Sequence, residues 1–551
     1  MLLAIHDVSF PSDADEDIGR GSPSTRAADR LFAFARSLGF TGIQLGPQGQ
    51  TARSNPSPYD GTIFSRHVGN IALRSLRAGG AFAGLIDDRV IDAAVITGGG
   101  SARYLHAHDA MHALLDDAYC ALERGARPDL RERLTAFRRE HAAWLESDAL
   151  HTAYCESHGG AGFRDWPARD RDLWITRDDA RYAELRSLHA RAIDRYAFAQ
   201  LLVHDEHAHL RARIALALYG DLQVGYSDAD AWVHAGAFLD GYSMGAPPSR
   251  TNPDGQPWGY PVLDPAQADR ALALVIARAN KAFAEYDSLR IDHPHGLVCP
   301  WVYRDDVRRG ARLFESPDIA DLAPFAIARL DQLNATRPRY ADDWVHDLDA
   351  AQVDRYARFI DAILNASEHN GRSRADLSCE VLSTMPYQLG RVLARHGLGR
   401  WRVTQKANLD DPHDVYRTET VAREDWLMLG NHDTPPIFAV IRAWSPAERE
   451  KWARHLAARL RLLHPQRLVS DRYLASAMLA ELFVSAAENV SIFFADLFGV
   501  TERFNVPGVI DDANWTLRLP PDFEALHASQ LAHECALDVP LAVDIAVASQ
   551  S

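Results

Sequence analysis

Three carboxylates in this 551-residue sequence each follow an apolar stretch that is typical of a buried strand. They are Asp292 in "SLRIDHPHG", Glu380 in "LSCEVL" and Asp433 in "LMLGNHD". Burying an unpaired charge is costly, so such strands normally avoid it. Each residue alone has a structural explanation, as partner of Arg290, as helix cap or as turn residue. Three carboxylates ending three apolar strands instead indicate a catalytic site.

Such a set of carboxylates fits the cleavage of a glycosidic bond with retention of configuration. One ionised carboxylate attacks the anomeric carbon and a protonated one donates to the departing oxygen, with the two groups about 5–5.5 Å apart. Arg290 and Asp292 share one face of their strand, and the positive charge would keep Asp292 ionised. An apolar setting would raise the pKa of Glu380 so that it keeps its proton near neutrality.

The elements that must position these residues alternate between strand and helix. Eight short apolar runs are predicted as strands, most of them separated by sequence with helical periodicity. Eight strands alternating with helices predict an α/β fold, a (β/α)8 TIM barrel with catalytic side chains at the C-terminal ends of its strands. The predicted strands are residues 2–9, 42–47, 222–227, 289–294, 377–382, 401–405, 427–433 and 491–499.

The long interval between the second and third predicted strands is too large for one helix. Amphipathic patterns recur in it, so we expect a mainly helical insertion subdomain over residues 71–215, within one catalytic domain that spans residues 1–551. The stretch "HDEHAHL" at residues 204–210 could suggest a metal site, but a solvated helix face is the favoured interpretation.

Composition narrows the possible partners. The formal net charge is −16, from 75 acidic and 59 basic residues, which disfavours nucleic acid and anionic membrane surfaces and favours a neutral substrate. The five cysteines show neither a CxxC pair nor zinc-ligand spacing, so we expect reduced thiols in a cytoplasmic protein. The N-terminal stretch lacks the basic region of a signal peptide, and no apolar run has the length of a membrane span.

Several motifs resemble a known family. "LRIDHPHG", "SCEVL" and "GNHD" resemble the catalytic strand ends of the α-amylase clan. "LGPQGQTARSNPSPYDGTIFSRHVGN", "DGQPWGYPVLD" and "RFNVPGVIDDANWTLRLP" resemble segments of the amylomaltase, or 4-α-glucanotransferase, family in particular. The similarity runs with gaps from about His6 to Pro520 and is weakest in the helical insertion.

The resemblance implies a role for each matching residue. Asp292 would be the nucleophile, Glu380 the general acid and then base, and Asp433 the carboxylate that holds the hydroxyls of a distorted donor ring. The resemblance implies neither metal nor organic cofactor. The implied substrate-binding residues are Arg290 and His432 as charged and hydrogen-bonding neighbours, Tyr59 beneath the donor sugar, Trp258 on a loop over the acceptor side, and Asn505 near the cleft.

The activity expected from these observations is transfer of α-1,4-glucan segments between maltodextrins through a covalent glycosyl-enzyme intermediate. A sugar hydroxyl can outcompete water at ~55 M because held reactants reach effective molarities of about 10⁵ M or more. Aromatic platforms would hold the acceptor, and the candidates are Trp258, Tyr260, Trp301 and Tyr303. The alternatives are an α-amylase-like maltodextrin hydrolase and a non-catalytic α-glucan-binding protein. In each case the partners are maltooligosaccharides and other α-1,4-glucans.

Overall fold

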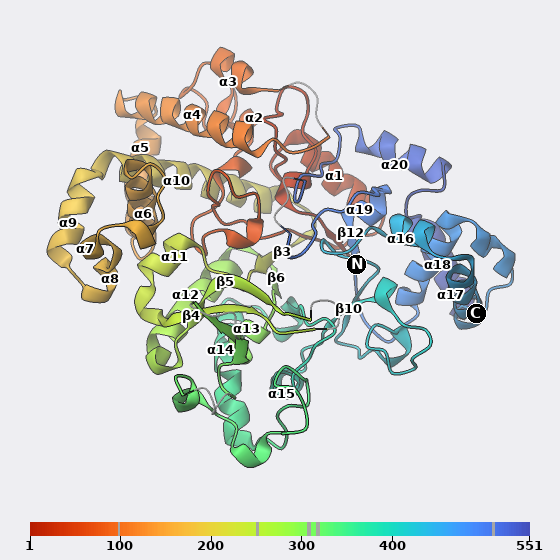
Figure 1. Ribbon diagram of the computed structural model, residues 1–551. Coiled ribbons are helices and arrows are strands. Elements are labelled where there is room, and N and C mark those ends of the chain that lie inside the picture. Colours follow the sequence, from red (N-terminus) through yellow and green to blue (C-terminus); the bar gives the residue numbers. More distant parts are fainter. Residues whose placement is uncertain (97–99, 250–252, 306–309, 316–319, 510–512, 551) are drawn as a thin grey trace.

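Eight short parallel strands form the central sheet of the computed structural model, which describes residues 1–96, 100–249, 253–305, 310–315, 320–509 and 513–550. Their hydrogen-bonded order is β10-β11-β12-β1-β2-β3-β6-β9, which is the chain order read cyclically. Among the described residues, only the neighbours β9 and β10 are not joined by strand pairing, so the sheet is nearly closed. The predicted (β/α)8 barrel is therefore confirmed (Figure 1). The strands are β1 (Leu2–Ala4), β2 (Gly42–Gln44), β3 (Ala217–Leu222), β6 (Ser288–Ile291), β9 (Leu377–Cys379), β10 (Trp401–Val403), β11 (Trp426–Met428) and β12 (Asn489–Phe493).

Helices follow most of the barrel strands and bury their apolar faces against them. The N-terminus of α1 shows why it begins where it does, since the Thr25 hydroxyl accepts a hydrogen bond from the N–H of Ala28. The barrel helices and the helices near the C-terminus are α1 (Arg26–Ser37), α12 (Ala268–Glu285), α13 (His295–Val298), α14 (Ala350–His369), α15 (Tyr387–His396), α16 (Ile437–Ala443), α17 (Pro446–Arg459), α18 (Asp471–Phe483), α19 (Phe494–Phe498), α20 (Phe523–Ala532) and α21 (Val539–Gln550).

Two strand predictions were wrong in position. The third strand is β3 at Ala217–Leu222, not residues 222–227, because Gly220 and Asp221 make its sequence look like a turn. The eighth strand ends at Phe493, and the apolar run continues as the short helix α19. A short, fully buried apolar run gives no periodicity that separates strand from helix.

Helices fill the interval between β2 and β3. They gather on one side of the molecule, coloured orange to yellow in Figure 1, and α10 packs against α5 and α6. Leu150, Trp166 and Trp232 belong to a small apolar cluster that is separate from the main core. The helices are α2 (Leu73–Leu76), α3 (Asp88–Ala94), α4 (Tyr104–Glu123), α5 (Pro128–Glu140), α6 (Leu145–Ser157), α7 (Ala168–Arg171), α8 (Leu173–Thr176), α9 (Asp179–Leu188) and α10 (Ala190–Arg213), and α11 (Asp228–Val233) follows β3.

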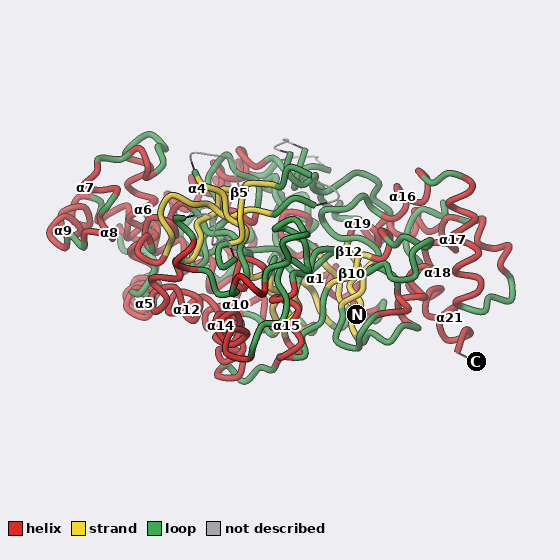
Figure 2. The backbone as a smooth tube through the Cα atoms, turned by 60° about the horizontal axis from the view of Figure 1, so that its bottom comes forward, coloured by secondary structure: helices red, strands yellow, loops and turns green. Residues whose placement is uncertain are grey.

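A second sheet was not predicted. Its four antiparallel strands have the order β5-β4-β7-β8, and they cover an apolar cluster that includes Met244, Val262 and Val302. In Figure 2 the strands near β5 lie apart from the barrel strands at β10 and β12. The strands are β4 (Phe238–Ala246), β5 (Gln256–Leu263), β7 (Trp301–Arg304) and β8 (Gly310–Arg312).

Among the described residues, no helix has both the length and the apolar character that crossing a membrane requires.

Candidate active site

Arg290 is the centre of the candidate site. It lies on β6 with a fully buried side chain, and its guanidinium donates to three carboxylates. Nη1 donates to Asp221, and Nη2 donates to Asp292 Oδ1 at 2.9 Å and to Glu380 Oε2. The planar fork of an arginine suits such multiple pairing.

The barrel strands bring these groups together. Asp292 directly follows β6, Glu380 directly follows the adjacent strand β9, and Asp221 on β3 lies in register with Arg290. One carboxylate oxygen of Asp292, one of Glu380 and a ring nitrogen of His293 all lie within 4.8 Å of one another. This proximity is compatible with the spacing of a retaining pair.

Asp292 is held in its ionised form. Burial by itself raises the pKa of Asp292, but the positive charge of Arg290, the charge of His293 and the hydrogen bonds to Asp292 together lower it by more. The N–H of Val224 donates to Asp292 Oδ2 at 3.1 Å and adds to the lowering. The net pKa lies below the ordinary aspartate value, as the Arg-x-Asp spacing predicted.

Glu380 does not lie in the purely apolar setting that the sequence suggested. Its Oε2 accepts a hydrogen bond from Arg290, whereas its buried Oε1 has no hydrogen-bond partner among the described residues. The two oxygens of one carboxyl group therefore have different surroundings, and Oε1 is the one left for another ligand or proton.

Asp221 is a residue of the candidate site that sequence reasoning missed. Burial raises its pKa to about 7, and the charges of Asp292 and Glu380 act in the same direction, while Arg290 opposes them. A single guanidinium thus faces three carboxylates, which favours retention of a proton within the group. The signal was present in "LYGDLQ", but the predicted strand began after Asp221.

Asp433 is next to His432, whose ring connects it to Tyr59 and Arg290, and Asn505 binds its carboxylate. The ring of His432 stacks on Tyr59 with centroids 5.5 Å apart, and the Tyr59 hydroxyl accepts from Arg290 at 3.3 Å and donates to Asp221 at 3.2 Å. Asp433 Oδ1 accepts from Asn505 Nδ2 at 2.6 Å. The half-buried Asp433 follows β11 at the same end of the barrel.

Trp258 lies on strand β5, not on the loop that was expected. Its ring stacks on His293, the residue after Asp292, with centroids 5.1 Å apart and planes 19° apart. Tyr260 is half-buried and donates to Asp60 at 2.7 Å. Trp301 and Tyr303 are only 5% and 4% exposed, so the prediction that they offer stacking faces to a sugar was wrong.

His6 is a second residue near the site that the sequence did not single out. It follows β1, and its buried ring contacts the rings of Tyr59, His432 and Trp515. Burial lowers the pKa of His6 well below its usual value, and the charges of His432 and Arg290 add to the effect. A neutral His6 is therefore part of the aromatic wall beside Tyr59.

Asp496 supports the segment that carries His432 and Asp433. This buried residue of α19 accepts at Oδ1 from the N–H of Ile437, where α16 begins, at 2.7 Å. Burial raises the pKa of Asp496 to about 7, and the N–H groups of Ile437 and Gly430 limit the rise. Asp496 thus ties the ends of β11 and β12 together.

The variant Asp496→Asn should change how stability depends on pH. Between the unfolded value of 3.8 and the folded value of about 7, the folded chain keeps a proton that the unfolded chain has lost. The free energy of unfolding of the native protein should therefore fall by up to about 4 kcal/mol as pH rises through this range. The non-titrating variant should not show this fall. Urea unfolding from pH 4 to 7.5 measures it, with the exposed Asp331→Asn as control. Parallel pH profiles for native protein and Asp496→Asn would contradict the assignment.

Two groups of described residues bring three metal-ligand atoms within 4.8 Å, namely Asp292, His293 and Glu380, and Glu419, His455 and Glu481. In the first group Arg290 already donates to both carboxylates. In the second, Arg417 pairs with Glu419, and His455 lies 2.7 Å from Glu481. In both groups, carboxylates thus already pair with cationic or imidazole groups of the protein.

Comparison with known proteins gives one matching family model. The model, described as 4-alpha-glucanotransferase, matches residues 5–524. Curated relatives carry the same name. The protein of Thermus thermophilus is 29% identical over 311 residues, 54% of this chain and 59% of that one. The protein of Chlamydia trachomatis is 24% identical over 406 residues, 70% of this chain and 66% of that one. The alignment thus spans less than two thirds of each of these relatives.

Solved structures extend the likeness over the whole fold. An amylomaltase from Streptococcus agalactiae, solved in complex with acarbose, has a TM-score of 0.74 at 17% identity, covering 97% of this chain and 99% of that one. An amylomaltase from Corynebacterium glutamicum has a TM-score of 0.65 at 16% identity, covering 100% of this chain and 75% of that one. These values show a shared fold.

Proposed function

Because the chain belongs to the 4-alpha-glucanotransferase family, glycoside hydrolase family 77, we propose that it transfers α-1,4-glucan segments between maltodextrins by a retaining double displacement. The observation that carries this proposal is the closeness of Asp292 and Glu380, both bonded to Arg290 and within 4.8 Å of each other. That spacing leaves no room for a water between the carboxylates, as inversion would require.

In the first step the Asp292 carboxylate attacks the anomeric carbon of the donor. The glycosidic carbon–oxygen bond breaks, and protonated Glu380 gives its proton to the departing 4-oxygen. The lowered pKa of Asp292 supports its role as nucleophile, and the unbonded Oε1 of Glu380 supports its role as acid.

In the second step the acceptor replaces the glycosyl ester. Its 4-hydroxyl gives a proton to Glu380 and bonds to the anomeric carbon, while the ester bond to Asp292 breaks and restores the carboxylate. Asp433 would hold hydroxyls of the distorted donor ring, and the hydrogen bond from Asn505 supports a fixed orientation of its carboxylate.

One aromatic residue is assigned to the donor sugar and another to the acceptor sugar. Tyr59, stacked on His432, would lie beneath the donor ring, and Trp258, stacked on His293, would contact the acceptor side. Maltooligosaccharides and other α-1,4-glucans are the proposed donors and acceptors. The acarbose in the Streptococcus agalactiae structure supports glucan-like ligands for this fold.

Incubation with maltotriose tests the function. Transfer should give a ladder of longer oligomers plus glucose, because the acceptor hydroxyl is held in attack geometry and outcompetes water. Products that are all shorter than maltotriose would contradict transfer and favour the hydrolase. Binding measured by calorimetry without any change in the sugars would favour the binding protein.

We also propose that the protein is located in the cytoplasm. All five cysteines, including the buried Cys299 and Cys379, are free thiols, which a reducing compartment would preserve.

A further inference from the structure

A long loop after β2 carries Tyr59 to the site, and we call residues 48–67 the Tyr59 loop. Its two arms meet at a narrow neck, where Gly49 pairs antiparallel with Arg66 and the N–H of His67 donates to the carbonyl of Gln48 at 2.9 Å. Tyr59 lies in the short turn Pro58–Asp60 at the far end of the loop. The position of Tyr59 therefore depends on how the neck is held.

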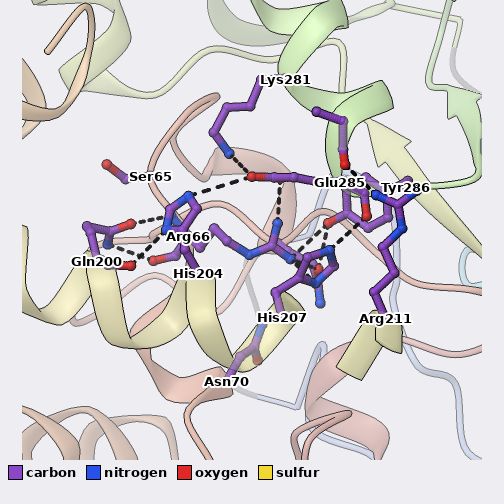
Figure 3. A network of polar contacts seen from close by, with 12 residues as sticks. Ser65, Arg66, Asn70, Gln200, His204, His207, Arg211, Lys281, Glu285 and Tyr286 are labelled. Carbon is purple, nitrogen blue, oxygen red and sulfur yellow. Dashed lines mark hydrogen bonds and ion pairs between the residues drawn. The ribbon is translucent and has the colours of Figure 1, made fainter. Parts of the chain in front are cut away.

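The side chain of Arg66 ties this neck to the barrel (Figure 3). Arg66 is 3% exposed, and its Nη1 donates to Glu285 Oε2 at 2.5 Å, at the end of α12. Its Nη2 donates to Gln48 on the opposite arm of the neck and to the Tyr286 hydroxyl at 3.2 Å. One guanidinium thus closes the neck and fixes it to the element that precedes β6.

The backbone of Arg66 is held from the other side by α10. Gln200 Oε1 accepts from the Arg66 N–H at 2.8 Å, and Gln200 Nε2 donates to the Arg66 carbonyl at 2.9 Å. His207 Nδ1 lies 2.6 Å from Arg66 Nη2, and its Nε2 lies 2.9 Å from the carbonyl of Glu285. The prediction of a solvated helix face for "HDEHAHL" holds for the exposed Ala208 and His209 but is wrong for the buried Glu206 and His207.

The network is expensive to bury. Lys281 Nζ also donates to Glu285. Burial would raise the pKa of Glu285, but the charges of its neighbours, first Lys281 and then Arg66, bring it below the ordinary value. Replacing such buried ions by apolar residues often leaves stability unchanged or improves it. The network therefore calls for an explanation other than stability.

We propose that Arg66 is a positioning residue that acts through Tyr59, so that α10 and the end of α12 hold the Tyr59 loop in its reactive geometry. This inference rests on the proposed function. A lysine at this position would keep one charge but would lack the fork that reaches Glu285, Gln48 and Tyr286 together.

The test compares Arg66→Met and Arg66→Lys in two backgrounds, native and Tyr59→Ala. In the native background we expect kcat on maltotriose to fall about 100-fold for Arg66→Met and about 10-fold for Arg66→Lys, because small displacements in a site have effects of this size. In the Tyr59→Ala background the same changes should alter kcat by about 2-fold or less, because the residue through which Arg66 acts is gone. Equal losses in both backgrounds would overturn the proposal.

Hydrogen exchange gives a readout that does not depend on activity. Amides of the Tyr59 loop, including that of Thr62, which donates to the Gln50 carbonyl, should exchange at least about 10-fold faster in either Arg66 variant. Unchanged protection of this loop would overturn the proposal even if activity fell. If Arg66→Met does not fold, Arg66→Lys is judged by the same criteria.

Arg138→Met provides the matched control. Arg138 on α5 also pairs with two carboxylates, Glu146 and Asp194, at 2.7 Å each, within the same group of helices. We expect its kcat to stay within about 2-fold of the native value. A native protein that fails to disproportionate maltotriose would refute the proposed function, and loop exchange alone would then decide whether Arg66 clamps the loop.

Discussion

Replacing Asp292 with asparagine should lower transfer from maltotriose by about 10⁴-fold or more, because removal of a residue that acts as a unit with its catalytic partners has effects of this order. The amide has nearly the same shape as the carboxylate but cannot form the glycosyl ester. Arg290 keeps Asp221 and Glu380 as partners, so the fold should survive. Initial rates of glucose release, together with circular dichroism, measure both expectations.

The matched control for this change is Asp287→Asn. Asp287 directly precedes β6, at the opposite end of the strand from Asp292, where it pairs with Arg211 and Arg372. Its replacement should change the transfer rate by about 3-fold or less, as expected of a surface pair. Substantial turnover by Asp292→Asn, or an equal loss in the control, would reject the assignment of the nucleophile.

Replacing Glu380 with glutamine should have an effect that depends on the donor. With maltotriose we expect a loss of about 10³-fold, because the departing 4-oxygen needs a proton and general acid catalysis contributes this much. With α-maltosyl fluoride the departing fluoride needs no proton, so the first step should slow by about 10-fold or less. Stopped-flow release of fluoride and chromatography of maltotriose products measure the two rates.

Glu315→Gln is the control for a buried glutamate. Glu315 accepts from Tyr356 at 2.7 Å, and its charged neighbour is Arg312 instead of Arg290. Both donors should be used by this variant at near-native rates. Equal losses of Glu380→Gln with both donors would show that Glu380 is not the acid.

The barrel could be predicted because its strands are short apolar runs between amphipathic helices. The closeness of Asp292 and Glu380 could also be predicted, because a charge ending a buried run is a strong signal in the sequence. Asp221 escaped because Gly220 and Asp221 interrupt the apolar pattern of β3, which moved the predicted strand by five residues. Because of this shift, Asp221 fell outside the predicted strand and was not recognised as a partner of Arg290.

Other features depend on packing between distant segments. The family resemblance implied a loop at Trp258, yet the stretch pairs with β4. His6 has no distinctive spacing, and its place among Tyr59, His432 and Trp515 follows only from barrel closure. Arg66 likewise gains its partners from two helices that are far apart in the sequence.

Mass spectrometry of the Glu380→Gln variant after reaction with α-maltosyl fluoride tests the central claim most directly. The variant can form the ester but lacks the base that activates an acceptor or water, so the intermediate should accumulate. The account predicts one added maltosyl group on the peptide that contains Asp292. A label on a different residue, or fluoride release with no labelled peptide, would contradict it.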